Sequence, residues 1–546
     1  MRNGEQQTVV IGLDGASYDL VRRWTAANEL PNLSAMMREG TWGRLDSVLP
    51  YQSVAAWTSF ITGTSPAKHG HFDFVTRMPG TRTVSHVNNA ATIDGRTLWA
   101  MLGEGGKRIG ILNVPVTYPV APVNGFMIPD WLTPSLGKSC TYPPEMGDEL
   151  RQKFGDYLFE FRSGPYELGR QRETRFLDEL YRTTERRAES ALYLMETRPW
   201  DFFMVVFTGP DTLQHFLWHY TDPAHPRHNP SAVAARGDAV LNYYRLLDGI
   251  VGEFRRHLAP RTRLFIISDH GFGPFVKMFN VNKLLMDLGL LVMEPGSTKG
   301  RSALLPIIER VDVFNLRQRL SRKLRQRVFN WIMTPPVDWA RTKAYAGTPT
   351  EGGIYINVHG RGPNGVVPEE EYGQLRDTIC AAVLAVRDPE TGGKVVERIH
   401  RKEDLYRGHY LAQMPDLLLV VAPGYELVES FDQARMFLPP TLRRTGTHRP
   451  EGVLLATGPG ILQGREIAPA SLLDVTPTLL YVNGLPISRD MDGRLLDIFD
   501  GAFREQTCPR YAEGLAAPAG TPRQPGWDPE AEEEVQRRLR ELGYLE

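Results

Sequence analysis

Short apolar runs alternate along this chain with longer segments in which apolar residues recur every three or four positions. The first run covers residues 8–13, is rich in β-branched side chains and leads into an Asp-Gly turn. Runs of this kind are typical of buried strands. The same pattern predicts five later strands, at 108–116, 201–209, 262–271, 416–424 and 452–460.

Two long segments between these runs have the spacing of amphipathic helices. They cover residues 174–198 and 239–258, and a shorter helix is predicted at 53–62. Strands that alternate with such helices favour an α/β fold in which helices sandwich a mostly parallel sheet. In sheets of this kind ligands bind outside the carboxyl ends of the strands, so the residues that follow each strand are candidates for a site.

The region from 275 to 410 interrupts this alternation. It contains a basic helical segment at 319–331 and a Gly- and Pro-rich section at 347–367. We interpret it as an inserted α+β cap over the carboxyl edge of the sheet. The basic segment is either a solvated face of the cap or a helix that binds a membrane or a partner. The expected domains are a core of 1–274 and 411–512, the cap of 275–410, and a linker with a docked C-terminal helix over 513–546.

Composition narrows the class of protein. The 546 residues include 63 basic and 64 acidic side chains, a formal net charge of -1, so we expect no sequence-specific binding of nucleic acid. Cys140, Cys380 and Cys508 are far apart, which argues against a disulfide framework or a cysteine metal site. No apolar stretch reaches the roughly 18 residues of a transmembrane helix, and the first run is too short for a signal peptide. We therefore expect a cytoplasmic protein.

Three aspartates and three histidines stand at predicted loop positions beside the strands. They are Asp14, Asp211, His215, Asp269, His270 and His448. Asp211 and His215 are four residues apart, so a helix that starts there would point both the same way. A mixture of carboxylates and imidazoles suits zinc or manganese better than calcium, which prefers all-oxygen sites. Six such ligands are about what two metal ions need.

Ser53 is the candidate nucleophile. It stands at the predicted start of the helix at 53–62, where the helix dipole and free N–H groups favour an alkoxide and an incoming phosphate. The alternative role is that of an ordinary N-cap serine. A hydroxyl placed beside two metal ions can also serve them as a shared ligand.

Five separated motifs hold these residues. They are GLDG (12–15), SVAAWTSFITGTSPAKHG (53–70), GPDTLQH (209–215), SDHG (268–271) and GTH (446–448). In these motifs and in their order the sequence resembles the alkaline phosphatase superfamily, in particular its type I phosphodiesterase/nucleotide pyrophosphatase branch. The resemblance covers roughly residues 7–500 and implies an alkaline-phosphatase-like fold.

The resemblance also implies a role for each site residue. It assigns Asp14, Asp269 and His270 to one metal ion, and Asp211, His215 and His448 to the other. Ser53 would contact the first ion, attack phosphorus and form a phosphoserine-type intermediate that water hydrolyses. The expected cofactors are two divalent ions, with zinc favoured and manganese as the alternative.

The chain departs from this branch at two positions. The nucleophile is Ser53 where the branch commonly has Thr, and Phe74 stands where the branch has an Asn that binds a phosphoryl oxygen. Arg77 lies nearby and, if it reached the site, would favour a dianionic monoester through a bidentate contact. Phe74 and Arg77 are therefore candidate substrate contacts. The expected substrate is a small phosphodiester or phosphomonoester, for example a nucleotide or a lipid head group.

Two other functions stay open at this point. One is a phosphomutase of the same superfamily, because the cap section at 337–361 is similar to a subgroup of predicted phosphohydrolases and phosphomutases. Mutases carry their large insertion before the second metal's first ligand, whereas here the longer stretch lies between His270 and His448. The other is a non-catalytic binding protein on this fold, which is disfavoured because all seven expected site residues are present.

Overall fold

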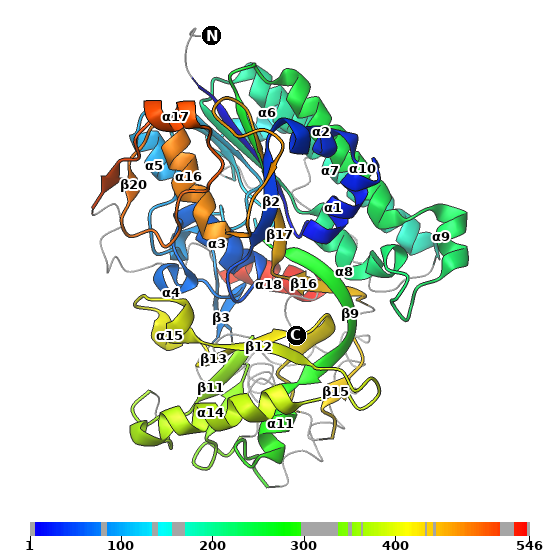
Figure 1. The fold of residues 1–546 in the computed structure, drawn as a ribbon, viewed down its shortest axis with the longest axis vertical. Helices are drawn as coiled ribbons and strands as arrows, with labels where there is room; N and C mark the ends of the chain where they lie inside the picture. Colours follow the sequence, from blue (N-terminus) through cyan, green and yellow to red (C-terminus); the bar gives the residue numbers. More distant parts are fainter. Residues whose placement is uncertain are drawn as a thin grey trace.

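The computed structural model describes residues 6–77, 84–133, 140–155, 170–295, 337–347, 352–361, 364–431, 434–440, 444–513 and 529–542. It shows a larger upper body and a smaller lower body (Figure 1). The basic segment predicted at 319–331 and the linker at 515–528 lie outside the described residues. None of the helices within the described residues is long and apolar enough to cross a membrane.

A nine-stranded sheet forms the centre of the upper body. Its order is β18(Arg465–Glu466), β2(Thr41–Asp46), β17(Glu451–Thr457), β8(Arg263–Ile267), β1(Thr8–Leu13), β7(Phe202–Phe207), β5(Ile109–Leu112) and β6(Gly125–Ile128), and β19(Ala470–Ser471) also pairs with β2. The strands β8, β1, β7, β5 and β6 run parallel, whereas β17 is antiparallel to both of its neighbours. The sheet is therefore mixed, with a parallel centre.

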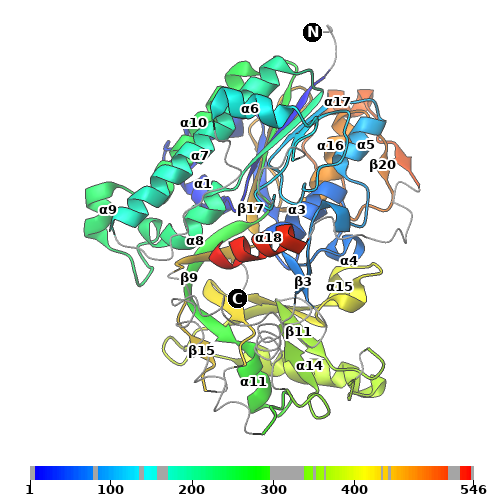
Figure 2. The ribbon, with the colours of Figure 1, turned by 180° about the vertical axis from the view of Figure 1, so that it is seen from behind.

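Both faces of this sheet are covered, as the continuous apolar runs predict. In β1, Val9 and Ile11 pack into the apolar core on one face, and Val10 packs into the core on the other. One face carries α1(Tyr18–Ala26), α2(Pro31–Glu39), α6(Met146–Phe154), α7(Arg170–Thr197), α8(Gly209–Thr221) and α10(Ala239–His257). The other face carries α3(Ser53–Thr62), α5(Leu98–Glu104) and α16(Val475–Val482). The view from behind shows the same sandwich (Figure 2).

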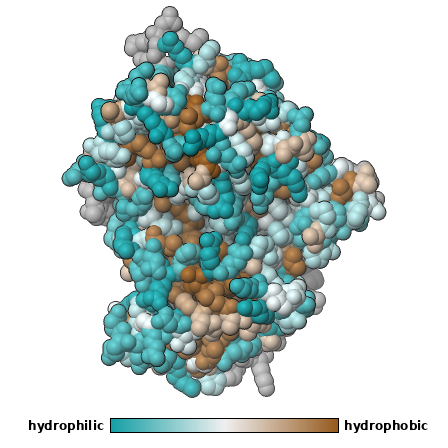
Figure 3. Space-filling model, in the orientation of Figure 1, coloured by the Kyte–Doolittle hydropathy of each residue, from teal (hydrophilic) through white to brown (hydrophobic). Residues whose placement is uncertain are grey.

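The lower body has its own sheet and core. Its four strands follow the order β10(Ala344–Ala346), β11(Gly353–Ile356), β13(Leu417–Val421) and β12(Val396–Arg401). The helices α11(Val281–Asp287) and α14(Glu369–Ala385) pack on it and bury Leu285, Ile379 and Val383 with the strands. Figure 3 shows an apolar area on this body, whereas hydrophilic side chains cover most of the upper body on the same face. We refer to the lower body as the cap.

A third small sheet joins the two bodies. The long strand β9(Gly271–Asn280) pairs with β16(Gly446–Arg449) where it leaves the upper body, and with β14(Gly424–Val428) and β15(Phe437–Leu438) further on. Figure 1 shows β9 curving from the main sheet down into the cap. Since β9 starts at Gly271, the last residue of the SDHG motif, the cap is tied directly to the candidate site.

Two sequence predictions differ from the structure. The strand predicted at 416–424 lies in the cap sheet and not in the main sheet, because β13 pairs with β11 and β12. The strand predicted at 108–116 ends at Leu112, and Asn113 and Val116 have positive φ angles in the loop that follows. A continuous apolar run does not reveal either its sheet partners or the residue at which it turns.

The remaining short elements surround this frame. They are α4(Pro66–His69), β3(Val75–Arg77), β4(Val84–Val87), α9(Pro230–Arg236), α15(Lys402–Leu405), β20(Ile487–Ser488), α17(Gly501–Gln506), β21(Tyr511–Ala512) and α18(Pro529–Leu542). The predicted C-terminal helix is α18, and its docking is confirmed because Val535 and Leu539 are buried against Val54 and Trp131. It lies between the upper body and the cap (Figure 2).

Candidate active site

Three neighbouring strands end together at one edge of the main sheet. The central strand β1 is parallel to β7 on one side and to β8 on the other, with Leu13 opposite Phe207 and Gly12 opposite Ile267. The residues that follow these strands, beginning with Asp14, therefore meet at the carboxyl edge. Segments more than 190 positions apart in the chain are brought together there by strand pairing alone.

Asp14, Asp269 and His270 form the first cluster. Each offers one ligand atom, and these atoms lie within 4.8 Å of one another. The His270 Nε2 atom is 3.4 Å from Asp269 Oδ2 and 3.6 Å from Asp14 Oδ1. All three residues are almost fully buried, so two carboxylates and an imidazole face each other away from water.

Neighbouring donors orient the two carboxylates of this cluster. The Trp57 indole donates to Asp14 Oδ2 at 3.0 Å, and the Gly15 backbone N–H donates to Asp269 Oδ1 at 3.1 Å. The other oxygens, Asp14 Oδ1 and Asp269 Oδ2, are buried without a hydrogen-bond partner among the described residues. Buried carboxylate oxygens without a partner are costly unless a cation is bound, so this donor set fits a divalent metal ion.

The pKa shifts of the carboxylates in this cluster also fit a bound divalent metal ion. Burial, together with the charges of Asp269 and Asp211, raises the pKa of Asp14 well above its usual value. Burial and Asp211 likewise raise the pKa of Asp269. The His270 Nδ1 atom lies 3.0 Å from the Gly271 carbonyl, and a proton on Nδ1 leaves the lone pair of Nε2 free for a metal.

Asp211, His215 and His448 form the second cluster. Their ligand atoms also lie within 4.8 Å of one another, with His448 Nε2 at 2.9 Å from Asp211 Oδ1 and at 3.1 Å from His215 Nε2. Burial opposes ionisation of Asp211, but the His215 and His448 rings hold its pKa well below the usual value. Burial, and then the neighbouring His270, lowers the pKa of His448 to about 3, so this ring is neutral and able to bind a metal.

Local sequence explains how the second cluster is placed. Asp211 and His215 lie one turn apart on α8, as their spacing predicts, and His448 lies on β16. The side chain of Gln214 donates to the Gly15 carbonyl at 2.8 Å, which ties α8 to the loop that carries Asp14. A Cβ at Gly446 would lie 2.3 Å from the Gln214 carbonyl, so only glycine lets β16 approach α8 this closely.

Ser53 lies where the sequence places it, at the first residue of α3. The N-cap of α3 is Gln52, and Ser53 Oγ lies 3.2 Å from His270 Nε2. The side chain is buried and is oriented toward the first cluster. A simple N-cap role therefore does not describe it, and its position beside the ligand atoms suits a nucleophile.

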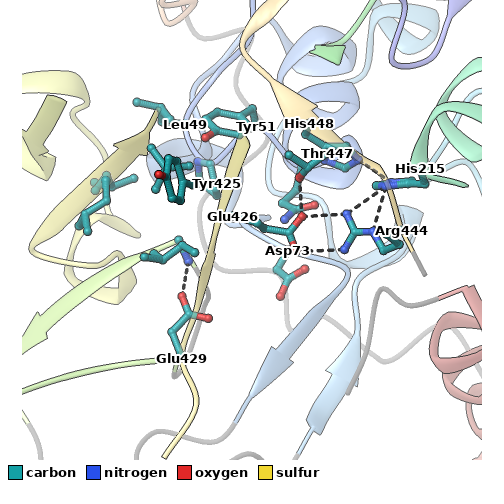
Figure 4. A pocket seen from close by; sticks show the side chains of 17 residues that line it. Leu49, Tyr51, Asp73, His215, Tyr425, Glu426, Glu429, Arg444, Thr447 and His448 are labelled. Carbon is teal, nitrogen blue, oxygen red and sulfur yellow. Dashed lines mark hydrogen bonds and ion pairs between the residues drawn. The ribbon is translucent and has the colours of Figure 1, made fainter. Parts of the chain in front are cut away.

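A cavity of about 150 Å³ opens on the second cluster. His215 and His448 line it on the core side (Figure 4). Leu418, Leu419 and Val421 of β13 line it from the cap. Its other lining residues include Tyr51, Asp73, Tyr425, Glu426, Arg444 and Thr447. Core and cap therefore form its wall together, as expected for an inserted cap.

The structure gives different results for the two candidate substrate contacts, Phe74 and Arg77. Phe74 is buried in an apolar cluster, where its ring lies 5.7 Å from that of Trp131, and Asp73 lines the cavity in its place. The Phe74 ring is buried there because it is apolar and packs in the same cluster as Val54 and Val535. The backbone of Arg77 ends β3, and its side chain lies outside the described part of the structure.

Sequence reasoning missed three residues that the structure places at the site. Trp57 holds Asp14, Gln214 holds the GLDG loop, and Arg444 donates to His215. The spacing of Ser53 and Trp57, one helical turn, was a usable signal for the first. No local signal marks Arg444, because its contact depends on a residue 229 positions away.

The comparison with protein families identifies the family of this chain. The model of the type I phosphodiesterase/nucleotide pyrophosphatase family matches residues 8–451. The chain belongs to this family. The α/β fold with a mixed sheet and an added cap agrees with that assignment.

Solved structures of ectonucleotide pyrophosphatase/phosphodiesterase 5 align with most of the chain. Human ectonucleotide pyrophosphatase/phosphodiesterase 5 shares 12% identity and covers 91% of this chain and 100% of its own, with a TM-score of 0.47. An inactive variant of the murine protein, in complex with AMP, shares 12% identity over 88% of this chain and 96% of its own, also with a TM-score of 0.47. Among curated protein sequences none matches the chain.

Family membership supports phosphoester hydrolysis of the nucleotide pyrophosphatase and phosphodiesterase type. The structure adds that the seven residues named from the motifs lie together at one edge of the sheet. The metal ions, the nucleophile and the substrate are matters of proposal.

Proposed function

We propose that this protein hydrolyses small-molecule phosphoesters through Ser53, with two divalent metal ions held by the first and second clusters. The observation that carries the proposal is the position of Ser53 Oγ, 3.2 Å from a ligand atom of the first cluster. The second cluster lies next to it, since Asp211 Oδ1 is 3.9 Å from His270 Nε2. A buried hydroxyl beside two triads of candidate metal ligands suits phosphoryl transfer.

The donor sets fit divalent ions. Asp14, Asp269 and His270 would hold one ion and Asp211, His215 and His448 the other, and mixed oxygen and nitrogen ligands favour zinc, with manganese as the alternative. Bound there, such ions would supply positive charge that lowers the pKa of the Ser53 hydroxyl and neutralises the phosphoryl group. The strongest support for bound cations is that Asp14 Oδ1 and Asp269 Oδ2 have no hydrogen-bond partner among the described residues.

Ser53 would carry out the covalent step. Its Oγ attacks phosphorus and gives up its proton, the bond from phosphorus to the leaving oxygen breaks, and the leaving oxygen takes up a proton. A phosphoseryl intermediate forms, which keeps its second ester group when the substrate is a diester. Water then attacks phosphorus, the bond to Oγ breaks, and the serine hydroxyl recovers its proton. The N-terminal N–H groups of α3 are placed to bind the phosphoryl oxygens in both steps, because Ser53 is the first residue of that helix.

The substrate is proposed to be a small phosphodiester or phosphomonoester. The cavity beside the second cluster has a wall of apolar cap residues, such as Leu418 and Val421, and charged residues such as Arg444 and Glu426 nearer the metal-binding side. A group attached to the phosphate would therefore lie against the cap. Nucleotides and lipid head groups both satisfy this description.

A substitution at Ser53 tests the proposal. Ser53→Ala should lower the turnover of p-nitrophenyl phosphate and bis-p-nitrophenyl phosphate by about a thousandfold or more, since the covalent route is removed. The matched control is Ser34→Ala on α2, whose hydroxyl accepts a hydrogen bond from Arg38 at the surface. Turnover by Ser53→Ala equal to that of the control would exclude Ser53 as the nucleophile.

A further inference from the structure

The cap contacts the core at a second place, away from β9. The cap segment that begins with α15 lies beside α4 of the core (Figures 1 and 2). The Tyr410 backbone N–H donates to the Ala67 carbonyl of α4 at 2.9 Å. Ala67 and Phe72 of the core form one buried apolar cluster with Met414 and Leu418 of the cap. The cap is therefore fastened to the core by this contact as well as by β9.

Tyr406, the residue that follows α15, extends from this contact to the chain that leads to the nucleophile. Its hydroxyl oxygen accepts a hydrogen bond from the Leu49 backbone N–H at 2.7 Å. The Leu49 side chain packs against the same apolar cluster. Burial raises the pKa of Tyr406, so the phenol stays neutral near pH 7. The cap thus holds Leu49 through both its backbone and its side chain.

Leu49 belongs to the loop that connects β2 with α3. Residues 49–52 of this loop line the cavity, and the nucleophile follows them directly. At the start of the loop the Ser47 N–H donates to the Pro450 carbonyl at 2.9 Å, and its last residue is the N-cap of α3. Tyr406 holds the loop between these two points, so the cap contributes to the path that the chain takes toward the site.

The path of this loop bears on the direction of the attacking hydroxyl. A nucleophile attacks efficiently only from an aligned position, and a displacement of about 1 Å can cost about a hundredfold in rate. Ser53 lies only four residues beyond Leu49. We propose that Tyr406 is a positioning residue, which fixes the loop from the cap and so aligns Ser53 Oγ with the phosphorus of a bound substrate. The inference rests on the proposed function, because it needs Ser53 as the nucleophile.

This arrangement couples the cap to the covalent step. Leu418 belongs to the apolar cluster on which Leu49 packs, and it also lines the cavity. A substrate group that lies against Leu418 therefore stabilises the same contact that holds the loop. The nucleophile is aligned when the cap is seated on the core, which is also the arrangement that encloses the substrate.

A second tyrosine at this contact separates positioning from simple docking of the cap. The Tyr410 hydroxyl donates to Asp94 Oδ2 at 3.0 Å, and Asp94 lies on the loop that precedes α5. Tyr406 and Tyr410 thus both join the cap to the core through a phenol hydroxyl, but to different loops. If these hydroxyls only dock the cap, the loss of either should have a similar effect. If Tyr406 positions the nucleophile, the loss of its hydroxyl should slow the reaction more.

Kinetics and phosphate binding of two matched variants test the inference. Both substitutions keep the aromatic ring that packs at the contact. Tyr406→Phe in zinc-loaded protein should lower kcat/KM by about tenfold for p-nitrophenyl phosphate or bis-p-nitrophenyl phosphate, whichever the wild type cleaves. Its affinity for inorganic phosphate, measured by calorimetry, should stay within about twofold of the wild type, because Tyr406 does not bind the phosphate. Its zinc content should equal that of the wild type. Tyr410→Phe should change neither kcat/KM nor phosphate affinity by more than about twofold.

Several results would overturn the inference. One is a kcat/KM of Tyr406→Phe within about twofold of the wild type, and another is an equal fall in Tyr410→Phe, since Tyr406 would then only dock the cap. A third is a phosphate affinity that falls as far as kcat/KM, which would make Tyr406 a substrate-binding residue. Loss of zinc from Tyr406→Phe is the fourth, because the residue would then support the metal sites. The proposed function fails separately, if the wild type binds no metal or Ser53→Ala stays active.

Discussion

The two clusters of candidate metal ligands differ in how their buried charges are compensated when no metal ion is bound. The first has two carboxylates and one imidazole, and within the described part of the chain it leaves Asp14 Oδ1 and Asp269 Oδ2 without hydrogen-bond partners. The second has one carboxylate and two imidazoles, and its members bind one another, as His448 does Asp211 at 2.9 Å. Burial raises the pKa of Asp14 and Asp269, whereas the histidines lower that of Asp211.

Two clusters with three candidate ligands each can therefore differ in how strongly they need a bound metal ion. The first cluster concentrates negative charge away from water and is stable in its ionised form only with a cation. The second compensates its charge internally, and Arg444 donates to its outer edge. We therefore expect the first cluster to bind a metal more tightly and to depend on it more for stability.

Removal of the metal ions should have the largest consequence. Chelation should lower phosphoester hydrolysis by about a thousandfold or more, and added zinc should restore it. A zinc titration followed by calorimetry should resolve two steps, of which the tighter is lost in Asp269→Asn and the weaker in His448→Asn. The reverse assignment of the two steps would contradict the comparison, and protein that never binds zinc or manganese would favour a non-catalytic role.

Substitution of one carboxylate in each cluster should change the stability of the metal-free protein in opposite directions. Asp269→Asn should raise the free energy of unfolding at pH 8 by about 1–3 kcal/mol, since it removes a buried charge beside Asp14. Asp211→Asn should lower it by a similar amount, because His448 loses a charged acceptor. Urea unfolding after chelation measures both. A shift of the same sign in the two variants would show that the clusters do not differ in this way.

Substitution of Trp57 tests how far metal binding at the first cluster depends on neighbouring hydrogen-bond donors. Trp57→Phe keeps an aromatic ring in the core but removes the indole N–H that holds Asp14 Oδ2. Outer hydrogen bonds of this kind are worth about 10–100-fold in metal affinity, so zinc binding at the tighter step should weaken by about that factor. Trp99→Phe on α5 is the matched control in the same apolar core. Equal zinc affinity in both variants would show that the indole does not orient the carboxylate.

Asp130 is a buried carboxyl outside both clusters. Burial raises its pKa to about 7, while Val116 N–H donates to Oδ2 at 2.5 Å. Its folded pKa lies above the ordinary value of 3.8, so its contribution to stability is complete below about pH 4 and is lost as the pH rises through 7. Asp130→Asn should remove this dependence and be more stable at pH 8 by about 1–2 kcal/mol. Thermal unfolding between pH 5 and 8 measures the effect, which added zinc should leave unchanged.

Much of the fold could be read from local pattern. The apolar run at 8–13 is β1, the segment at 174–198 is most of α7, and the helix predicted from residue 53 starts there. Alternation with periods of two and about 3.6 residues determines such elements because burial acts on each face separately. The sheet to which the run at 416–424 belongs could not be read this way, since pairing with β11 and β12 depends on segments far along the chain.

The candidate site, like the fold, could be predicted from the sequence only in part. The motifs supplied the chemistry of each ligand, and the ends of parallel strands predicted that Asp14, Asp211 and Asp269 would meet. Phe74 and Arg444 show the limit, because an aromatic ring enters whichever apolar cluster lies beside it, and a guanidinium donates to whichever acceptor lies within its reach.

The sequence by itself determined the elements, the family and the types of side chain that converge on the edge of the sheet. Only the tertiary structure decided which carboxylate oxygens lack a hydrogen bond from the described residues, that Trp57 holds Asp14, and that Arg444 lies against His215. The physical reason is the separation along the chain over which each interaction acts. Helix and strand preferences act over a few residues, whereas hydrogen bonds and charges at the site join atoms whose residues lie up to hundreds of positions apart.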